Sequence, residues 1–382
     1  MTNILELFSG IGVVIDEAIF EEGDTLNGIQ KISQSLQENH IPLLEYEELP
    51  NEFIGQFHSV SFVILDWNLS GERPIPEATI NDNIAFIRSL KDVCFAPLFI
   101  FSDEDPHDIQ VKLEECGIYT NNCPIFIKKK DELDTTEKLF SEIGVWLKQT
   151  PSMYVLKEWD KATREAKTNM LWALSSIHPA WPSVLSKSIQ DDGGDEPSEL
   201  MRLLQNNLSY RLVCPQFDMD IIGSQVDGIG KDGLRNLLEC ERFILHVSLP
   251  DHPFAGDIYL MDEKYFMNIR PDCDIIRSPR NKDMYLLKGK IVDEATINSG
   301  DEGEILFDSG EFLEKNNNCY VAFVRGNILC FSLRDIELRK WKDIKDHRIG
   351  RLLPPYITKI QQKYAAYLQR QGLPSIPKES IK

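Results

Sequence analysis

The sequence lacks the cysteine patterns that mark common metal and redox sites. It has eight cysteines, but no two form a CxxC pair and none joins histidines at the spacing of a zinc site. This excludes the usual structural zinc sites and dithiol redox motifs. We expect the cysteines to be reduced and mostly buried thiols, which is typical of a reducing compartment.

Long hydrophobic runs are also missing. No stretch approaches the roughly 18 consecutive apolar residues of a transmembrane helix. The first residues, MTNILELFSGIGVVIDEAIFEEGD, place no basic flank before the apolar run and soon become acidic, so they do not resemble a signal peptide. We therefore expect a soluble, cytoplasmic protein.

Positive charge is scarce. The chain has 41 Lys and Arg against 61 Asp and Glu, a net charge of -20. Such a chain repels nucleic acid and anionic lipid unless a local basic patch overrides the field, but it does not repel a divalent cation. The sequence also has no GxSxG motif, no complete phosphate loop and no kinase signature. No separate catalytic motif is therefore found, and an enzymatic activity stays open.

What the sequence does contain is a regular alternation of short apolar runs and amphipathic segments over residues 1–149. The expected strands are Ile11–Ile15, Pro42–Tyr46, Val60–Leu65, Pro97–Phe101 and Pro124–Ile127, and the expected helices are 24–38, 83–92, 106–117 and 133–148. Near-continuous apolar strands that alternate with helices predict an α/β domain with a parallel sheet covered on both faces.

The pattern changes after residue 150. Segments 154–177 and 197–210 have helical periodicity, which predicts a helical linker or subdomain over 150–212. Residues 213–382 predict a mixed α+β region with a small antiparallel part, whose strands we expect at Phe243–Val247, Asp257–Met261, Asp283–Lys288, Glu302–Phe307, Cys319–Val324 and Ile328–Leu333. Arg325-Gly326-Asn327 predicts a hairpin turn. A basic amphipathic helix, Pro355–Gln371, ends the region.

Chemically useful residues follow four of the first five predicted strands. They are Asp16-Glu17, Asp66, Ser102 and Lys128. The carboxyl ends of parallel strands form the binding crevice of an open α/β sheet, so these residues are expected to converge. Three acids can hold Mg²⁺, while a lysine and a hydroxyl can contact the oxygens of a phosphoryl group.

The segment VILDWNLSG (63–71), an apolar strand that ends in Asp66, resembles the receiver domain of two-component response regulators. The resemblance spans about residues 11–149. It implies a flavodoxin-like five-stranded parallel sheet in the order 2-1-3-4-5 and Asp66 as the phosphorylated aspartate. It also implies Mg²⁺ held by Asp16, Glu17, Asp66 and the backbone carbonyl of Asn68. Ser102 and Lys128 then take the hydroxyl and lysine positions.

The sequence departs from the usual receiver pattern in three places. Lys129 and Lys130 follow Lys128 where a proline is usual, and Ile125 stands where an aromatic residue is common. The extra residues Glu72–Pro76 lengthen the loop after Asp66. The residues that carry chemistry are thus present, whereas those that relay the signal differ.

The resemblance implies a response regulator that takes a phosphoryl group from a histidine kinase and signals through a non-DNA-binding C-terminal domain. Alternatives are a phosphate sink, an interaction scaffold, a receiver-switched effector enzyme and, because of the basic C-terminal segment, a DNA-binding regulator. The architecture is loosely similar to the receiver proteins of anti-phage Detocs-type two-component systems, which favours the sink in antiviral defence. An effector partner and a homodimer are left open, and no membrane partner is expected.

Overall fold

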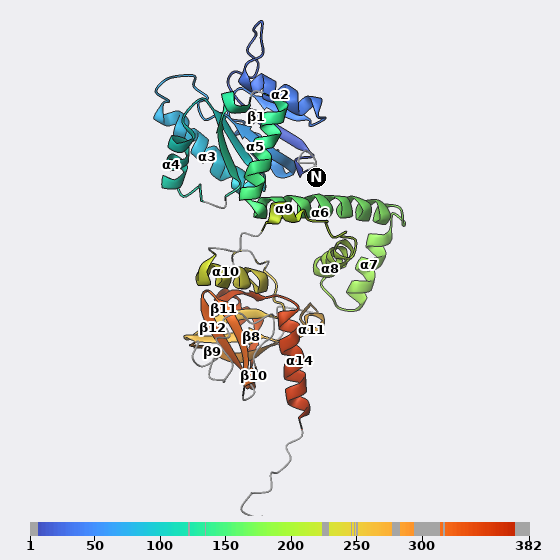
Figure 1. Ribbon diagram of the computed structural model, residues 1–382. Coiled ribbons are helices and arrows are strands. Elements are labelled where there is room, and N and C mark those ends of the chain that lie inside the picture. The colour runs from blue at the N-terminus through green and yellow to red at the C-terminus, as the bar shows by residue number, and fades with distance from the viewer. Residues whose placement is uncertain are drawn as a thin grey trace, which may run out of the picture. The chain divides into compact units, whose positions relative to one another are not determined.

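The computed structural model describes residues 7–120, 123–133, 135–223, 229–245, 247, 249, 251–276, 283–293, 314–315 and 318–370. The chain divides into two compact units (Figure 1). The first contains Met1–Trp172 and Leu208–Gln225, and the second contains Ala173–Asn207 and Val226–Lys382.

The first unit contains the predicted parallel sheet. Its strands are β1 (Ile11–Ile15), β2 (Leu43–Tyr46), β3 (Val60–Leu65), β4 (Leu98–Ser102) and β5 (Ile125–Lys129). They pair in parallel in the order β2-β1-β3-β4-β5, which confirms the α/β class and the strand order.

Helices cover both faces of this sheet because its strands are apolar on both sides. In β3, Phe62 and Ile64 join one core, whereas Val63 and Leu65 join the other. The first core is covered by α2 (Gly28–Glu38) and α5 (Thr136–Gln149), and the second by α3 (Glu77–Val93) and α4 (Pro106–Glu115). Short 3₁₀ helices, η1 (Ile54–Ser59) and η2 (Lys130–Leu133), precede β3 and follow β5.

Strand β5 extends two residues beyond its predicted end. Ser102 of β4 pairs with Lys129, so backbone pairing continues through Lys128 and Lys129. The apolar run that predicts this strand ends at Ile127, but an edge strand tolerates the polar side chains of Lys128 and Lys129. Lys130 is therefore the first residue after β5.

The first unit does not end at residue 149. Helix α6 (Pro151–Ser175) follows α5 almost at once, and its Met153 and Tyr154 are buried in the core beneath α2 and α5. Ile221 of the short helix α9 (Met219–Ile222) joins the same core, and the Tyr154 hydroxyl accepts a hydrogen bond of 2.8 Å from the backbone N–H of Asp218. Because this packing crosses the predicted boundaries at 149 and 212, the compact units divide the chain differently.

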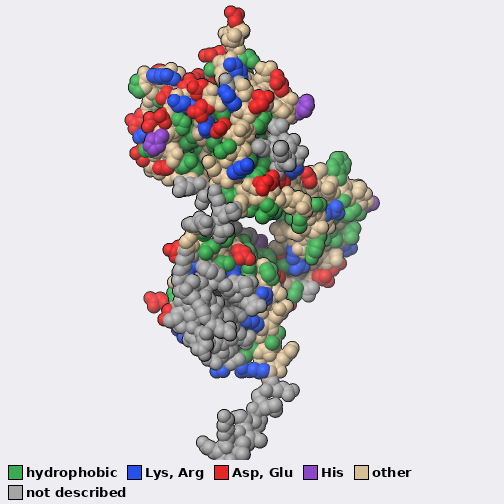
Figure 2. Space-filling model, in the orientation of Figure 1, with side chains coloured by type: hydrophobic (Ala, Val, Ile, Leu, Met, Phe, Trp, Pro, Cys, Tyr) green, Lys and Arg blue, Asp and Glu red, His purple; other side chains and the backbone are tan. Residues whose placement is uncertain are grey.

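The second unit begins with helical segments. Helices α7 (Trp181–Asp191) and α8 (Glu196–Ser209) follow α6. Neither contains a fully buried residue; Val184 and Met201 are largely exposed, and hydrophobic side chains are visible on this part in Figure 2. Helix α8 agrees with the predicted segment 197–210. Helix α7 was not predicted from the sequence, and it contains no buried residue that would give it a clear apolar face.

The remainder of the second unit is an antiparallel sheet with helices, as the predicted α+β class requires. Its described strands are ordered β10-β11-β12-β9-β8-β7-β13-β6. They are β6 (Phe243–Leu245), β7 (Asp257–Met261), β8 (Lys264–Asn268), β9 (Asp283–Val292), β10 (Glu314–Lys315), β11 (Asn318–Val324), β12 (Asn327–Lys340) and β13 (Arg348–Leu352). The predicted strand Glu302–Phe307 lies outside the described residues.

The turn between β11 and β12 and the helix α14 agree with the sequence, whereas the burial of the cysteines does not. Arg325 and Gly326 both have positive φ and join β11 to β12, which confirms the hairpin. Ile357 and Ile360 of α14 (Tyr356–Gln369) are buried, so that helix packs on its own unit. The expectation of mostly buried cysteines is wrong for the described ones, because Cys214, Cys240 and Cys273 are exposed.

The other helices of this unit are α10 (Gly230–Arg242), α11 (Asp272–Ile276), α13 (Trp341–Ile344) and the 3₁₀ helix η5 (Lys345–His347). None of the helices in the described part of the chain has both the length and the apolar character needed to cross a bilayer.

Candidate functional site

The candidate site lies at the carboxyl edge of the parallel sheet. Asp16 directly follows β1 and Asp66 directly follows β3, so the parallel pairing of these strands brings the two acids to one edge. The backbone N–H of Asp66 donates to the carbonyl of Ile15 at 2.8 Å, which extends the pairing to the acids themselves. Asp16 is fully buried and Asp66 is 3% exposed.

Three of the predicted acids meet here. One carboxylate oxygen each from Asp16, Glu17 and Asp66 lies within 4.8 Å of the other two. The structure thus brings together the acids that the sequence analysis selected. Carboxylates so close to one another repel unless a cation or protons compensate them.

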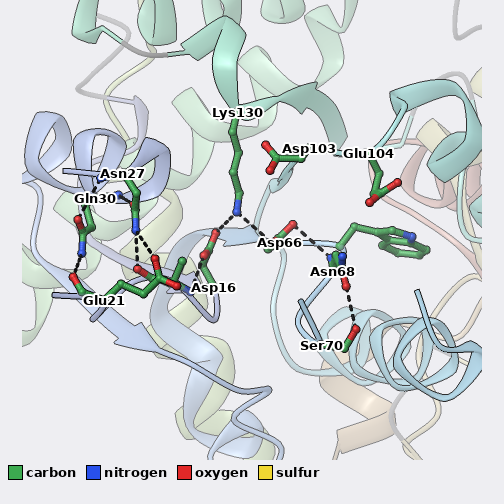
Figure 3. A network of polar contacts seen from close by, with 12 residues as sticks. Asp16, Glu21, Asn27, Gln30, Asp66, Asn68, Ser70, Asp103, Glu104 and Lys130 are labelled. Atoms are coloured by element: carbon green, nitrogen blue, oxygen red, sulfur yellow. Dashed lines mark hydrogen bonds and ion pairs between the residues drawn. The ribbon is translucent and has the colours of Figure 1, made fainter. Parts of the chain in front are cut away.

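Lys130 supplies part of that compensation, which the sequence analysis missed. Its Nζ lies 2.6 Å from Oδ2 of Asp16 and 2.9 Å from Oδ2 of Asp66. Figure 3 shows the side chain pointing from the end of β5 to both acids. Only 12% of the Lys130 side chain is exposed, so this ammonium is a buried bridge between the two strand ends.

Lys128 is not part of this cluster, so the prediction that its side chain converges with the acids is wrong. Its Nζ lies 3.1 Å from Glu132 and 2.8 Å from Glu142 of α5, in partly exposed ion pairs. Side chains alternate along a strand, so Lys128 shares the face of Phe126, which packs in the core beneath α5. The lysine that joins the acids does directly follow β5, but the predicted strand ended at Ile127, two residues too early.

Burial and charge set the proton affinities of the site. Burial raises the pKa of the Asp16 carboxyl, an effect that Lys130 only partly offsets. Burial, followed by the neighbouring Asp66 and Asp16, raises the pKa of Glu17 to about 7. Burial disfavours the ammonium of Lys130, but attraction to Asp66 and Asp16 outweighs this and raises its pKa.

The acids retain unused oxygen lone pairs. Oε2 of Glu17 is buried and has no hydrogen-bond partner among the described residues. Oδ2 of Asp16 contacts Lys130 as an ion pair but receives no well-directed hydrogen bond. Three carboxylates face one ammonium, so negative charge remains in excess. Hard divalent cations are bound by such oxygen donors, and this cluster can hold a metal ion.

Ser102 ends β4 at the same edge of the sheet. The residue is 1% exposed, and its Oγ has no hydrogen-bond partner in the part of the chain that the structure describes. A buried hydroxyl without a partner is costly, so an unpaired hydroxyl at a strand end points to a ligand oxygen that it can contact.

The loop after Asp66 is held by its own polar groups. The backbone N–H of Asn68 donates to Oδ1 of Asp66 at 3.2 Å, and its side-chain amide donates to the carbonyl of Glu72 at 3.1 Å. Asn83 of α3, which the sequence analysis did not select, donates to the carbonyl of Trp67 at 2.7 Å. These contacts fix the backbone beside Asp66, including the predicted metal-ligating residue Asn68.

The lengthened part of that loop reaches the loop after β4. Arg73 lies 3.7 Å from Asp103 and 3.6 Å from Glu104 through exposed ion pairs. Such pairs contribute little stability, but they connect the two loops that border the site.

Comparisons with known proteins do not identify a family for this chain. A scan against protein-family models finds no match, and searches of curated proteins and of solved structures find no similar protein.

Proposed function

We propose that residues 11–149 form a receiver domain with a flavodoxin-like sheet, and that Asp66 accepts a phosphoryl group in a Mg²⁺-dependent reaction. The observation that carries this proposal is the cluster of three carboxylates at the carboxyl edge of the β2-β1-β3-β4-β5 sheet, in which Lys130 bridges the buried Asp16 and Asp66 and Glu17 is partly buried. It combines in one place an acceptor, a metal-binding set and a fixed cation.

The residues fit Mg²⁺ by their chemistry. Asp16, Glu17 and Asp66 offer oxygen ligands, and the buried Oε2 of Glu17 has no partner among the described residues. The backbone carbonyl of Asn68 is the expected fourth ligand. When bound, Mg²⁺ supplies positive charge that allows an anionic phosphoryl donor to approach an anionic acceptor.

The protein's own residues have distinct roles in the proposed transfer. An oxygen of the Asp66 carboxylate forms a bond to phosphorus while the P–N bond of the kinase's phosphohistidine breaks. The electron pair of that bond returns to the imidazole, which takes a proton from water. Lys130 offers its ammonium to a phosphoryl oxygen, and the Ser102 hydroxyl donates to another.

With Lys130 in the lysine position, the lengthened loop Glu72–Pro76 is unchanged, and two departures beside the lysine persist. Asp131 follows the lysine instead of proline, and Ile127 stands three residues before it, where an aromatic residue is common. The proposed chemistry does not require the usual proline or aromatic residue, because in the receiver pattern these two residues relay the signal. A histidine kinase as donor and a non-DNA-binding output from the second unit are part of the same proposal.

Acetyl phosphate tests the acceptor without a partner kinase. We expect the wild-type chain to gain one phosphoryl group, measured by intact mass, with Mg²⁺ present and not with EDTA. Asp66→Asn should remain unlabelled. Asp103→Asn is the matched control, because Asp103 is an exposed acid in a neighbouring loop. Equal labelling of Asp66→Asn and wild type would refute the acceptor role.

A further inference from the structure

A pocket lies at the edge of the parallel sheet opposite to the cluster of acids. Strand β3 runs from Val60 at the pocket to Leu65 beside Asp66. The pocket has a volume of about 400 Å³, within the range of small-molecule sites, and is formed by the start of β3, the turn before β4 and helix α6. Its walls include Ser61, Phe95, Leu156, Trp159, Arg164 and Lys167, all in the first unit.

The pocket combines apolar and cationic walls. Phe95, Leu156 and Trp159 are 54%, 43% and 56% exposed and line the same pocket, and exposed apolar side chains gathered in one place mark binding sites. On α6, Leu156 and Trp159 share one face with Arg164 and Lys167 because residues three and four apart are neighbours on a helix. The face therefore presents apolar surface beside two cations.

The cations of this region exceed its acids. Arg164 donates through Nη1 to the carbonyl of Ser9 at 2.9 Å, and its Nε lies 3.5 Å from Asp160, the one acid among the lining residues. Its Nη2 is buried without a hydrogen-bond partner among the described residues. This donor could serve an anion.

Lys157 adds a further positive charge behind the wall. It is 1% exposed, and its Nζ donates to the carbonyl of Ser61 at 3.0 Å and to the Ser61 hydroxyl at 3.3 Å. No carboxylate within the described part of the chain forms an ion pair with it. Burial lowers the pKa of Lys157 to about 8, as expected for a desolvated ammonium.

We propose that this pocket binds a small organic anion with a flat aromatic body, whose charge meets Arg164 and Lys167 and whose ring packs on Phe95, Leu156 and Trp159. The walls offer both kinds of contact, and cations in excess of acids are notable in a chain of net charge -20. The proposal goes beyond phosphoryl transfer, because the pocket contains none of the residues of the acidic cluster.

The probe is 8-anilinonaphthalene-1-sulfonate, an aromatic anion, added to the full chain. The readout is local: Cys94 lines the pocket and is a free thiol, so its modification by N-ethylmaleimide can be followed by peptide mass mapping. The probe should slow modification of Cys94 but not of the exposed Cys214. Absence of protection at saturating probe would overturn the proposal.

Two variants and a control assign the protection to the walls. Lys167→Glu and Trp159→Ala change exposed side chains, and each should raise the probe concentration for half protection about tenfold, equivalent to about 1.4 kcal/mol. Lys31→Glu makes the same charge change on an exposed site of α2 and should leave protection unchanged. Equal protection in all four proteins would overturn the assignment. In Asp66→Asn the probe should protect Cys94 as it does in the wild type, which separates this test from the test of phosphorylation.

Discussion

Replacing Lys130 by methionine removes the cation that bridges Asp16 and Asp66 while keeping the apolar stem. The two contacts, at 2.6 and 2.9 Å, each correspond to a gross attraction of about 6 kcal/mol at an effective dielectric constant of about 20. Desolvation cancels much of this, and loss of one partner of a buried pair costs about 3–5 kcal/mol. At pH 7.5 and without a divalent cation, we therefore expect Lys130→Met to lower the free energy of unfolding by about 3–5 kcal/mol.

Lys128→Met is the matched control. It makes the same change two residues earlier, where the Lys128 side chain is 30% exposed and its acidic partners are 49% and 34% exposed. Such surface pairs contribute at most about 1 kcal/mol. The two variants therefore separate the buried bridge from the surface pair.

Hydrogen exchange followed by mass spectrometry measures the loss within the first unit alone. Each 1.4 kcal/mol is a factor of about ten, so a loss of 3 kcal/mol speeds exchange in peptides covering β1 and β3 by about 150-fold. The stability difference between Lys130→Met and wild type should shrink as pH falls from 7.5 to 5. The pKa of Asp16 is already raised in the folded state, so the folded variant takes up protons that remove the unpaired negative charge. Equal exchange in Lys130→Met and Lys128→Met would refute the bridge, and so would a stability difference independent of pH.

Three other perturbations test separate parts of the structure. Glu17 must lose its proton to bind a metal, and its pKa is about 7, so Mg²⁺ affinity measured by calorimetry should rise from pH 6 to 8; in Glu17→Gln the affinity should be weaker and flat over this range. Ser102→Ala should leave thermal stability unchanged or slightly higher, because Oγ has no partner among the described residues, yet weaken Mg²⁺-dependent beryllofluoride binding by at least about tenfold; unaltered binding would remove Ser102 from the site. Gly256 has φ of +89° and a Cβ there would lie 2.1 Å from the carbonyl oxygen of Leu352, so Gly256→Ala should destabilise the second unit by at least about 1–3 kcal/mol in hydrogen exchange and leave phosphorylation of the first unit intact.

The parallel sheet was predictable because its strands are uninterrupted apolar runs. Ile11–Ile15 and Val60–Leu65 have the predicted bounds, and the acids that follow them were therefore located correctly. The end of β5 was not, because Lys128 and Lys129 look like a loop when the pairing with β4 is unknown. That two-residue difference is the whole reason why Lys130 was missed.

The second unit was harder to predict because some of its turns and strands lack local signals. Asp262 and Glu263 both have positive φ and join β7 to β8, a geometry that sequence analysis expects of Gly or Asn. Strand β13 was missed because it carries two arginines. Arg348 and Arg351 contact the buried Asp257 at 3.5 and 2.6 Å. Asp257 is far away in the sequence, so the pattern of residues in the strand does not predict this partner.

The site of phosphorylation is the most direct test of the central claim. After treatment with acetyl phosphate and Mg²⁺, borohydride reduces an aspartyl phosphate to homoserine, which tandem mass spectrometry locates. We expect homoserine at position 66 in the wild-type chain and none when EDTA replaces Mg²⁺. Homoserine at another aspartate, with residue 66 unchanged, would contradict this expectation.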